Sequence, residues 1–198
     1  LNGSYTLASN FTVGGTLFLN NAYTLNLSSF KATLNSAFTI VGTGGIFTGT
    51  SGTLEFASLT VSVNLPQITL LVNSLIINSS GQTVTMNGNV TVGTGGLFLT
   101  NGTLNIGTSN SLTLNGGISG GATLLGGTNS SIIISTPGAG SIASFPAVSV
   151  SNLTINRTGG VTLAGNVSVS GTLTLTSGTL DNSTSSLTMG NGASIIRN

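Results

Sequence analysis

The feature of this sequence that most constrains its fold is a run of short triplets between Val161 and Leu180. In this stretch, VTLAGNVSVSGTLTLTSGTL, the triplets VTL, VSV and LTL begin at positions 161, 167 and 173, and Gly, Asn and Ser separate them. Each triplet has apolar residues at its ends and Thr or Ser in the middle, which is the alternation of a strand with one buried face. Strands this short are not stable alone. They fold only if the chain coils and stacks each triplet on an equivalent one.

A longer repeat contains these triplets. Val84–Gly102 (VTMNGNVTVGTGGLFLTNG) aligns with Val161–Gly178 (VTLAGNVSVSGTLTLTSG) across one gap, and a more diverged copy begins at Tyr5. The copies start 79 and 77 residues apart, which gives a repeat of about 78 residues. Because segments of about 19 residues recur inside it, we expect about four coils in each long repeat and about ten coils of 18–20 residues in all.

These periods predict an all-β fold, a parallel β-helix (β-solenoid) that runs as one continuous segment over residues 1–198. No segment shows helical periodicity, and Thr and Val favour strands while Gly and Asn favour corners with positive φ. Asn-Gly pairs recur and can also form hairpin turns, which leaves an antiparallel sandwich or meander as the alternative. We place Pro66 at a corner, because proline cannot donate a ladder hydrogen bond, and we interpret 136–148 as a loop or distorted coil.

The alternation also assigns side chains to the inside and the outside of the coil. The apolar residues predicted to stack in the core are Leu7, Val13, Leu25, Val92, Leu104, Leu114, Leu163, Val169, Leu175 and Leu180. The Thr residues predicted to stack in an outward column are Thr6, Thr24, Thr85, Thr103, Thr123, Thr162 and Thr179. Only 3% of the residues are charged. Like charges stacked about 4.8 Å apart would repel, whereas Thr, Ser and Asn stack without that penalty.

The scarcity of reactive side chains excludes most chemistry. The chain has no His and no Cys, its acids are Glu55 and Asp181, and its bases are Lys31, Arg157 and Arg197. The two acids are predicted to lie about six coils apart, roughly 30 Å, whereas paired-carboxylate hydrolysis needs them within about 10 Å. We interpret the three bases as solvated single charges. The sequence therefore predicts no catalytic residue, no metal ligand and no cofactor, so that the protein is not an enzyme.

Two glycine-rich stretches and many sequons have simpler explanations than binding sites. VGTGG at 41–45 and 92–96 lacks the Lys and the following helix of a phosphate-binding loop, so we interpret both as corners. Asn-x-Ser/Thr occurs eleven times, partly because the sequence repeats, and the sequon asparagines are Asn2, Asn10, Asn26, Asn78, Asn89, Asn101, Asn129, Asn152, Asn156, Asn166 and Asn182.

The outward Thr residues also permit an ice- or glycan-binding module, since a flat face of regularly spaced Thr, Ser and Asn can order water or bind sugars. A second, mixed outward column is predicted to contain Thr12, Thr33, Thr91, Thr113 and Thr188 beside Ile133 and Ser168. The simpler interpretation is that these are ordinary outward strand residues. A third possibility is a solenoid enzyme that acts on polysaccharide, against which the lack of clustered acids and bases argues.

Composition also limits the partners. Nucleic-acid binding needs a basic face, but the net charge is +1. No run approaches 18 apolar residues, so we expect no membrane span. A surface with so little charge repulsion should associate. We therefore expect self-association or stacking into a fibre, or continuation within a longer chain of which these residues are an excerpt, with surface glycans as a further possible partner.

Three phrases carry a resemblance to known proteins: SGTLTLTSGTLDNSTSSLTMGNGASIIRN, NVTVGTGGLFLTNGTLNIG and NLTINRTGGVTLAGNVSVSGTLTL. They resemble the repeat regions of very large, adhesin-like surface proteins that Bacteroidota-like bacteria export by the type IX system. They are more distantly similar to filamentous-haemagglutinin and autotransporter passenger repeats. The resemblance covers nearly the whole chain. It implies a right-handed parallel β-helix that serves as a stalk or adhesive fibre, extracellular and at the cell surface.

Overall fold

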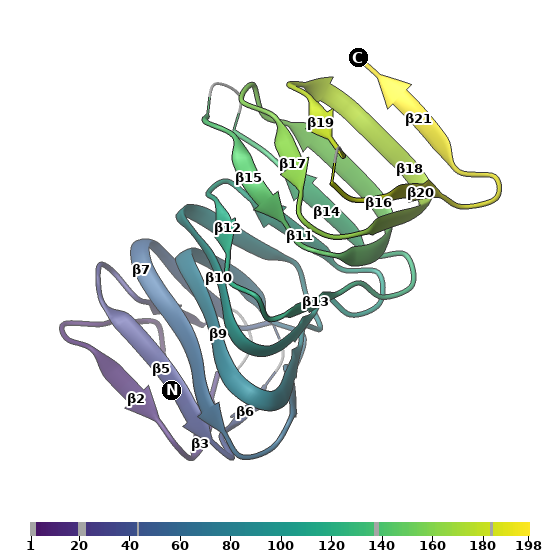
Figure 1. Ribbon diagram of the computed structural model, residues 1–198. Coiled ribbons are helices and arrows are strands. Elements are labelled where there is room, and N and C mark those ends of the chain that lie inside the picture. The colour runs from purple at the N-terminus through teal and green to yellow at the C-terminus, as the bar shows by residue number, and fades with distance from the viewer. Residues whose placement is uncertain (1–2, 20–22, 43, 137–138, 183) are drawn as a thin grey trace.

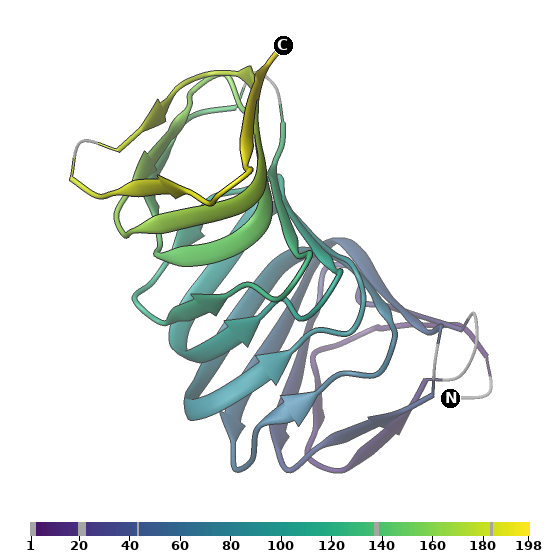
Figure 2. The same ribbon diagram turned by 90° about the vertical axis from the view of Figure 1, so that its right-hand side faces the viewer.

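The chain coils into a rod of stacked parallel strands (Figure 1). The computed structural model describes residues 3–19, 23–42, 44–136, 139–182 and 184–198. Within these ranges the chain forms strands β1 to β21 and no helix, and every strand pair is parallel. The turned view shows successive turns climbing from the purple end to the yellow end (Figure 2). The predicted β-solenoid is confirmed, and the antiparallel alternative is wrong.

Each turn has three faces, and face 1 is the most continuous. It contains β1 (Tyr5–Thr6), β4 (Thr24–Asn26), the first parts of β7 (Ile46–Leu59), β9 (Thr69–Thr85) and β10 (Val90–Asn105), then β11 (Ser111–Leu114), β14 (Ser131–Ile134), the second parts of β16 (Val148–Asn156) and β18 (Val167–Ser177), and β21 (Ser194–Arg197). Its inward residues pair in one ladder through Tyr5, Leu25, Phe47, Leu70, Val90, Leu112, Ile132, Leu153, Leu173 and Ile195.

That ladder fixes the length of a turn. Its neighbours in space lie 20 to 23 residues apart along the chain, so the described residues make about nine turns. The predicted coil of 18–20 residues was too short, and the predicted number of about ten coils too large. The reason is that corners hold more residues than the triplets alone reveal.

Faces 2 and 3 are more interrupted. Face 2 contains β2 (Phe11–Val13), β5 (Lys31–Ser36), middle or later parts of β7, β9 and β10, and then β12 (Ile118–Ser119), β15 (Ile142–Phe145), β17 (Val161–Leu163) and β19 (Leu180–Asp181). Face 3 contains β3 (Thr16–Phe18), β6 (Thr39–Val41), β8 (Val63–Asn64), the ends of β9 and β10, β13 (Thr123–Leu125), the first parts of β16 and β18, and β20 (Leu187–Met189). β3 and β6 form a separate sheet, as do β15, β17 and β19, so face 1 is the one ladder that spans the rod.

The three copies of the long repeat start on three different faces. Tyr5 lies on face 1, Val84 lies on face 3 between Val63 and Leu104, and Val161 lies on face 2. Each long repeat therefore spans eleven strand-and-corner units, or three and two-thirds turns. The expectation of four coils per repeat is wrong. Strands on all three faces have apolar residues inward and Thr or Ser outward. The sequence pattern therefore does not reveal on which face a triplet lies.

The core runs the length of the rod and is almost entirely aliphatic. Seven of the ten predicted inward residues are buried, and the other three, Leu7, Leu175 and Leu180, are half-buried and pack against the core. Burial of one such side chain contributes about 1.5–3 kcal/mol relative to leaving it exposed. Among the described residues no buried side-chain nitrogen or oxygen lacks a hydrogen-bond partner. The inward half of the pattern is thus confirmed.

The outward half is not one Thr column. Of the residues predicted to share a column, Thr24 lies on face 1, Thr103 on face 3 and Thr162 on face 2. The mixed second column is likewise split, because Thr12 and Thr33 lie on face 2, Thr91, Thr113 and Ile133 on face 1, and Ser168 and Thr188 on face 3. The cause is again the fractional number of turns in each long repeat, which moves equivalent residues to a new face.

Two irregular segments lie near where the sequence indicated. Pro66 lies between β8 and β9, at the corner from face 3 to face 1, as predicted. The segment 136–148 contains β15, whose pairing with β17 has a register irregularity, so it is a distorted turn. Pro137 itself lies outside the described residues.

Candidate functional site

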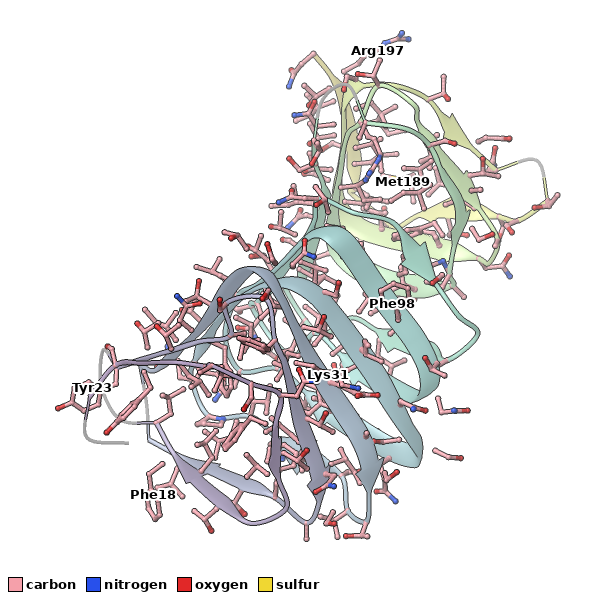
Figure 3. The ribbon with its side chains drawn as sticks, turned by 90° about the vertical axis from the view of Figure 1, so that its left-hand side faces the viewer. Phe18, Tyr23, Lys31, Phe98, Met189 and Arg197 are labelled. Atoms are coloured by element: carbon pink, nitrogen blue, oxygen red, sulfur yellow. The ribbon has the colours of Figure 1, made fainter. Side chains whose placement is uncertain are left out.

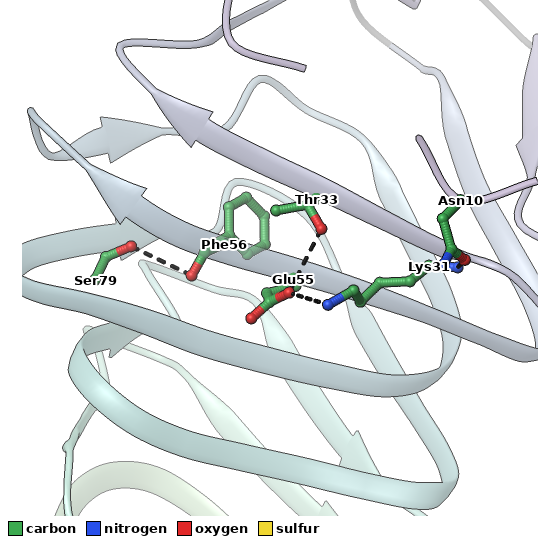
Figure 4. A network of polar contacts seen from close by, with 6 residues as sticks. All are labelled: Asn10, Lys31, Thr33, Glu55, Phe56 and Ser79. Carbon is green, nitrogen blue, oxygen red and sulfur yellow. Dashed lines mark hydrogen bonds and ion pairs between the residues drawn. The ribbon is translucent and has the colours of Figure 1, made fainter. Parts of the chain in front are cut away.

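On face 2, two ionisable side chains from neighbouring turns form an ion pair. Lys31 Nζ lies 2.7 Å from Glu55 Oε2, and the Thr33 hydroxyl donates to the same oxygen at 3.4 Å (Figure 4). Lys31 and Glu55 are 24 residues apart but lie on neighbouring turns. The interpretation of Lys31 as a single charge did not include this partner, because the length of that turn was not known. The ion pair lies at the surface, with the lysine side chain 45% exposed.

The two carboxylates do not form a catalytic pair. Glu55 and Asp181 are both on face 2. The face 1 ladder counts six turns between them, which is about 29 Å at a strand spacing of about 4.8 Å. Paired-carboxylate hydrolysis needs about 10 Å or less. No group of three or more His, Cys, Asp or Glu side chains that could hold a metal ion occurs in the described part of the chain.

Arg157 is a buried cation, so the expectation that it is solvated is wrong. Its guanidinium donates to the carbonyl oxygens of Gly140 at 2.7 Å, Gly116 at 3.0 Å and Asn115 at 3.3 Å. These carbonyls belong to the two preceding turns. Burial lowers the pKa of the guanidinium below its usual value, yet arginine keeps its proton in proteins. Arg157 thus holds three turns together where face 1 meets face 2, and it is not available to a ligand.

The glycine-rich stretches are corners, as predicted. Val92–Gly96 joins face 1 to face 2 within β10, and no helix follows it. Of the first stretch, Gly42 and Gly44 have positive φ, while residue 43 lies outside the described residues. Neither stretch has the helix N-terminus that a phosphate-binding loop requires.

Four of the sequon asparagines have a structural role where the chain enters a face of the rod. The side-chain oxygens of Asn10, Asn89, Asn152 and Asn166 accept a hydrogen bond, at 2.9 to 3.1 Å, from the main-chain N–H of the equivalent residue one turn later. An inward apolar residue and an outward Thr or Ser then follow. This arrangement produces Asn-x-Thr or Asn-x-Ser without any need for glycosylation. Asn2 lies outside the described residues.

Differences in corner length create a groove where face 1 meets face 2. At this corner β7 has three residues between paired positions, β9 has only Asn73, and β10 again has three. The short corner therefore lies between two long ones, with Thr50 on one side of Asn73 and Thr94 on the other. The hollow has a volume of about 470 Å³. Its lining residues are Thr48, Gly49, Thr50, Leu71, Val72, Asn73, Thr91, Gly93, Thr94, Asn115 and Thr136.

The groove is uncharged and its hydrogen-bonding groups are partly unused. Asn73 Oδ1 accepts from the Gly95 N–H at 3.0 Å and from the Thr94 hydroxyl at 3.4 Å, which fixes the longer corner beside it. The hydroxyls of Thr48, Thr50 and Thr91 form no hydrogen bond with another described residue. No sequence signal identified this site, because it depends on the lengths of three corners that lie about twenty residues apart.

The comparisons with known proteins do not assign a function. No protein-family model matches the chain, and neither the curated proteins nor the solved structures include a significant match. The described part of the chain contains no helix that could span a membrane.

Proposed function

We propose that this chain is a non-catalytic segment of an extracellular stalk or adhesive fibre at a cell surface. The observation that carries the proposal is the ladder of face 1, in which ten strands pair in parallel from Tyr5 to Ile195. Parallel stacking of this kind gives stability that adds up along the rod, so the rod can be lengthened without a new core. The resemblance of the repeats to adhesin-like proteins of the type IX system agrees with this role.

Uncovered apolar surface supports the stacking part of the proposal. Ile195 occupies the same ladder as Leu173, but it is 58% exposed whereas Leu173 is 1% exposed. A turn with free main-chain groups and exposed ladder residues is a template for another strand. We propose that a strand from a second copy of this chain pairs with this surface. Arg197 projects from this end of the rod (Figure 3).

The location is tested by labelling cells that produce the protein with an antibody raised against residues 1–198. The proposal expects label on intact cells and loss of that label after a brief treatment of intact cells with protease. Label that requires permeabilised cells would contradict the proposal. A cytoplasmic protein of the same cells, probed in parallel, reports whether the cells remained closed.

A second candidate is binding of glycan by uncharged groups, which the groove between faces 1 and 2 favours. Ice binding is the other form of this candidate. Its support is weaker, since the longest run of Thr residues paired across successive turns is Thr83, Thr103 and Thr123 on face 3. Thermal hysteresis measurements test it, with activity expected for an ice-binding surface and none for a stalk.

A further inference from the structure

We propose that the groove between faces 1 and 2 binds a neutral, linear polysaccharide along the axis of the rod. This inference rests on the proposed surface location, because only there does the rod meet such polymers, and it gives the adhesive role a specific site. Its support is the shape of the groove, the groups that line it and the lack of charge in its lining.

The shape of the groove suits an extended polymer. Its lining reaches from Thr48 on β7 to Thr136, just beyond β14. Those positions are four steps apart in the face 1 ladder, which corresponds to about 19 Å along the rod. The groove therefore crosses five successive turns. All five turns contribute lining residues, from Thr48 on the first to Thr136 on the last. A linear chain laid parallel to the axis can therefore contact every one of these turns, whereas a compact ligand uses only one or two.

The lining groups suit sugar hydroxyls. The hydroxyls of Thr48, Thr50 and Thr91 are free to donate or accept, and Asn73 keeps its Nδ2 hydrogens for a ligand while its Oδ1 is occupied. Leu71, which is 43% exposed, offers an apolar surface for the C–H face of a sugar ring. A few placed polar groups on an otherwise apolar surface are typical of binding pockets.

Other extended polymers fit less well. A peptide that binds as an added strand needs unpaired main-chain groups, but the strands along the groove are already paired on both sides. A nucleic acid or an acidic polysaccharide needs cations, and no ionisable side chain lines the groove. The nearby Arg157 already donates to three carbonyl oxygens. The ligand class that remains is a neutral polymer that is rich in hydroxyl groups.

The corners hold the groove open without a ligand. Thr94 and the neighbouring Gly95 N–H both donate to Asn73, so one wall is fixed by a contact between turns. Gly93 and Gly49 lie in close contact with the preceding turn, where an added Cβ would approach other atoms to 3.0 Å. A site that is formed beforehand loses less conformational entropy on binding.

The test is calorimetric titration of the folded chain with cellohexaose, xylohexaose, laminarihexaose and maltohexaose, with polygalacturonate and heparin oligomers as anionic probes. The double variant Thr48→Val, Thr91→Val removes two free hydroxyls while keeping side-chain shape. The matched control is Thr154→Val, Thr174→Val, which changes two similarly half-buried Thr residues of face 1 outside the groove. Circular dichroism and small-angle scattering of each sample show whether the rod is intact.

We expect at least one neutral hexaose to bind and the anionic probes not to bind. We expect the groove double variant to bind at least about tenfold more weakly, because each lost hydrogen bond is worth about 0.5–1.5 kcal/mol. The control should bind like the unchanged chain. Absence of binding to every neutral probe by an intact rod, or equal weakening by both double variants, would overturn the groove proposal. Neither result would alter the antibody labelling of intact cells, so failure of the groove is distinguishable from failure of the stalk.

Discussion

Val84–Val92 and Val161–Val169 share a sequence pattern but occupy different parts of the coil. The first begins on face 3 and continues onto face 1, whereas the second begins on face 2 and continues onto face 3. Both have apolar residues inward, a polar residue outward and a glycine at the corner between their strands. The interchangeable unit of this protein is therefore one strand with its corner, and three such units make a turn.

The same alignment pairs two polar residues that are buried at corners but form different hydrogen bonds. Ser79 of SLIINSSGQ aligns with Arg157 of NLTINRTGG, and both are buried. Ser79 lies within β9, at the corner between its face 2 and face 3 parts, whereas Arg157 directly follows β16. The Ser79 hydroxyl donates to the Phe56 carbonyl and accepts from the Leu59 N–H, both at 3.2 Å (Figure 4). Arg157 instead reaches carbonyls two turns away. Above each lies a glycine with positive φ, Gly102 or Gly178, next to the carbonyl of the polar residue.

The largest difference between the two corners should appear on removing Arg157. The variant Arg157→Met removes the guanidinium that donates to the carbonyls of Asn115, Gly116 and Gly140. Of these three, the Asn115 carbonyl keeps a hydrogen bond from the Thr136 hydroxyl at 3.2 Å. Hydrogen bonds to charged groups contribute about 1.5–3 kcal/mol each, and we expect a loss of about 4 kcal/mol in the free energy of unfolding because the three are not additive. Chemical denaturation measures it. Arg197→Met is the control, since Arg197 is exposed, and equal loss in both variants would contradict the role of Arg157.

The glycines test whether the two corners remain equivalent. Gly102→Ala and Gly178→Ala each place a methyl group against a main-chain carbonyl of the preceding turn, with φ at 88° and 79°. Left-handed backbone costs about 1–2 kcal/mol for alanine and overpacking about 1–3 kcal/mol, so we expect about 3 kcal/mol for either variant. Thermal unfolding compares them with Gly121→Ala, where the added methyl group meets open space. A difference above about 2 kcal/mol between the two would show that the corners are not interchangeable.

Ser79→Ala should have a smaller effect than Arg157→Met. It removes one buried hydroxyl, which donates to the Phe56 carbonyl and accepts from the Leu59 N–H. We expect a loss of about 1.5 kcal/mol in the free energy of unfolding, measured by denaturant titration. The exposed neighbour offers the control Ser80→Ala, which should change stability by less than about 0.5 kcal/mol. If Ser79→Ala cost as much as Arg157→Met, the distinction between the two corners would be lost.

The smallest expected effect concerns the ion pair between neighbouring turns. A double-mutant cycle with Lys31→Met and Glu55→Gln should give a coupling of about 0.5 kcal/mol, because exposed pairs rarely contribute more than about 1 kcal/mol. Measured at low and at high salt, this coupling should fall as salt screens the pair. A coupling above about 2 kcal/mol would mean that surface charge stabilises the rod as strongly as its buried corners do.

The sequence predicted those parts of the fold that depend on local pattern. Leu104 and Val169 are inward because each lies in an apolar-polar-apolar triplet, and Pro66 lies at a corner because it lacks an N–H. The face of each triplet was not predictable, since all three faces impose the same pattern. The groove and the contacts of Arg157 were not predictable either, because they depend on corner lengths summed over two or more turns.

The central claim is that each long repeat spans three and two-thirds turns. It is tested most directly by two distances between spin labels, measured by pulsed electron paramagnetic resonance. One sample carries labels at Thr91 and Thr174, which the ladder of face 1 places four steps apart. The other carries labels at Thr91 and Ser168, which are equivalent in sequence but lie on faces 1 and 3. The ladder predicts about 19 Å between the backbone sites of Thr91 and Thr174, and a longer distance between those of Thr91 and Ser168. If instead the labels at Thr91 and Ser168 were about 19 Å apart and those at Thr91 and Thr174 were further apart, the long repeat would span a whole number of turns. That result would contradict the three and two-thirds turns.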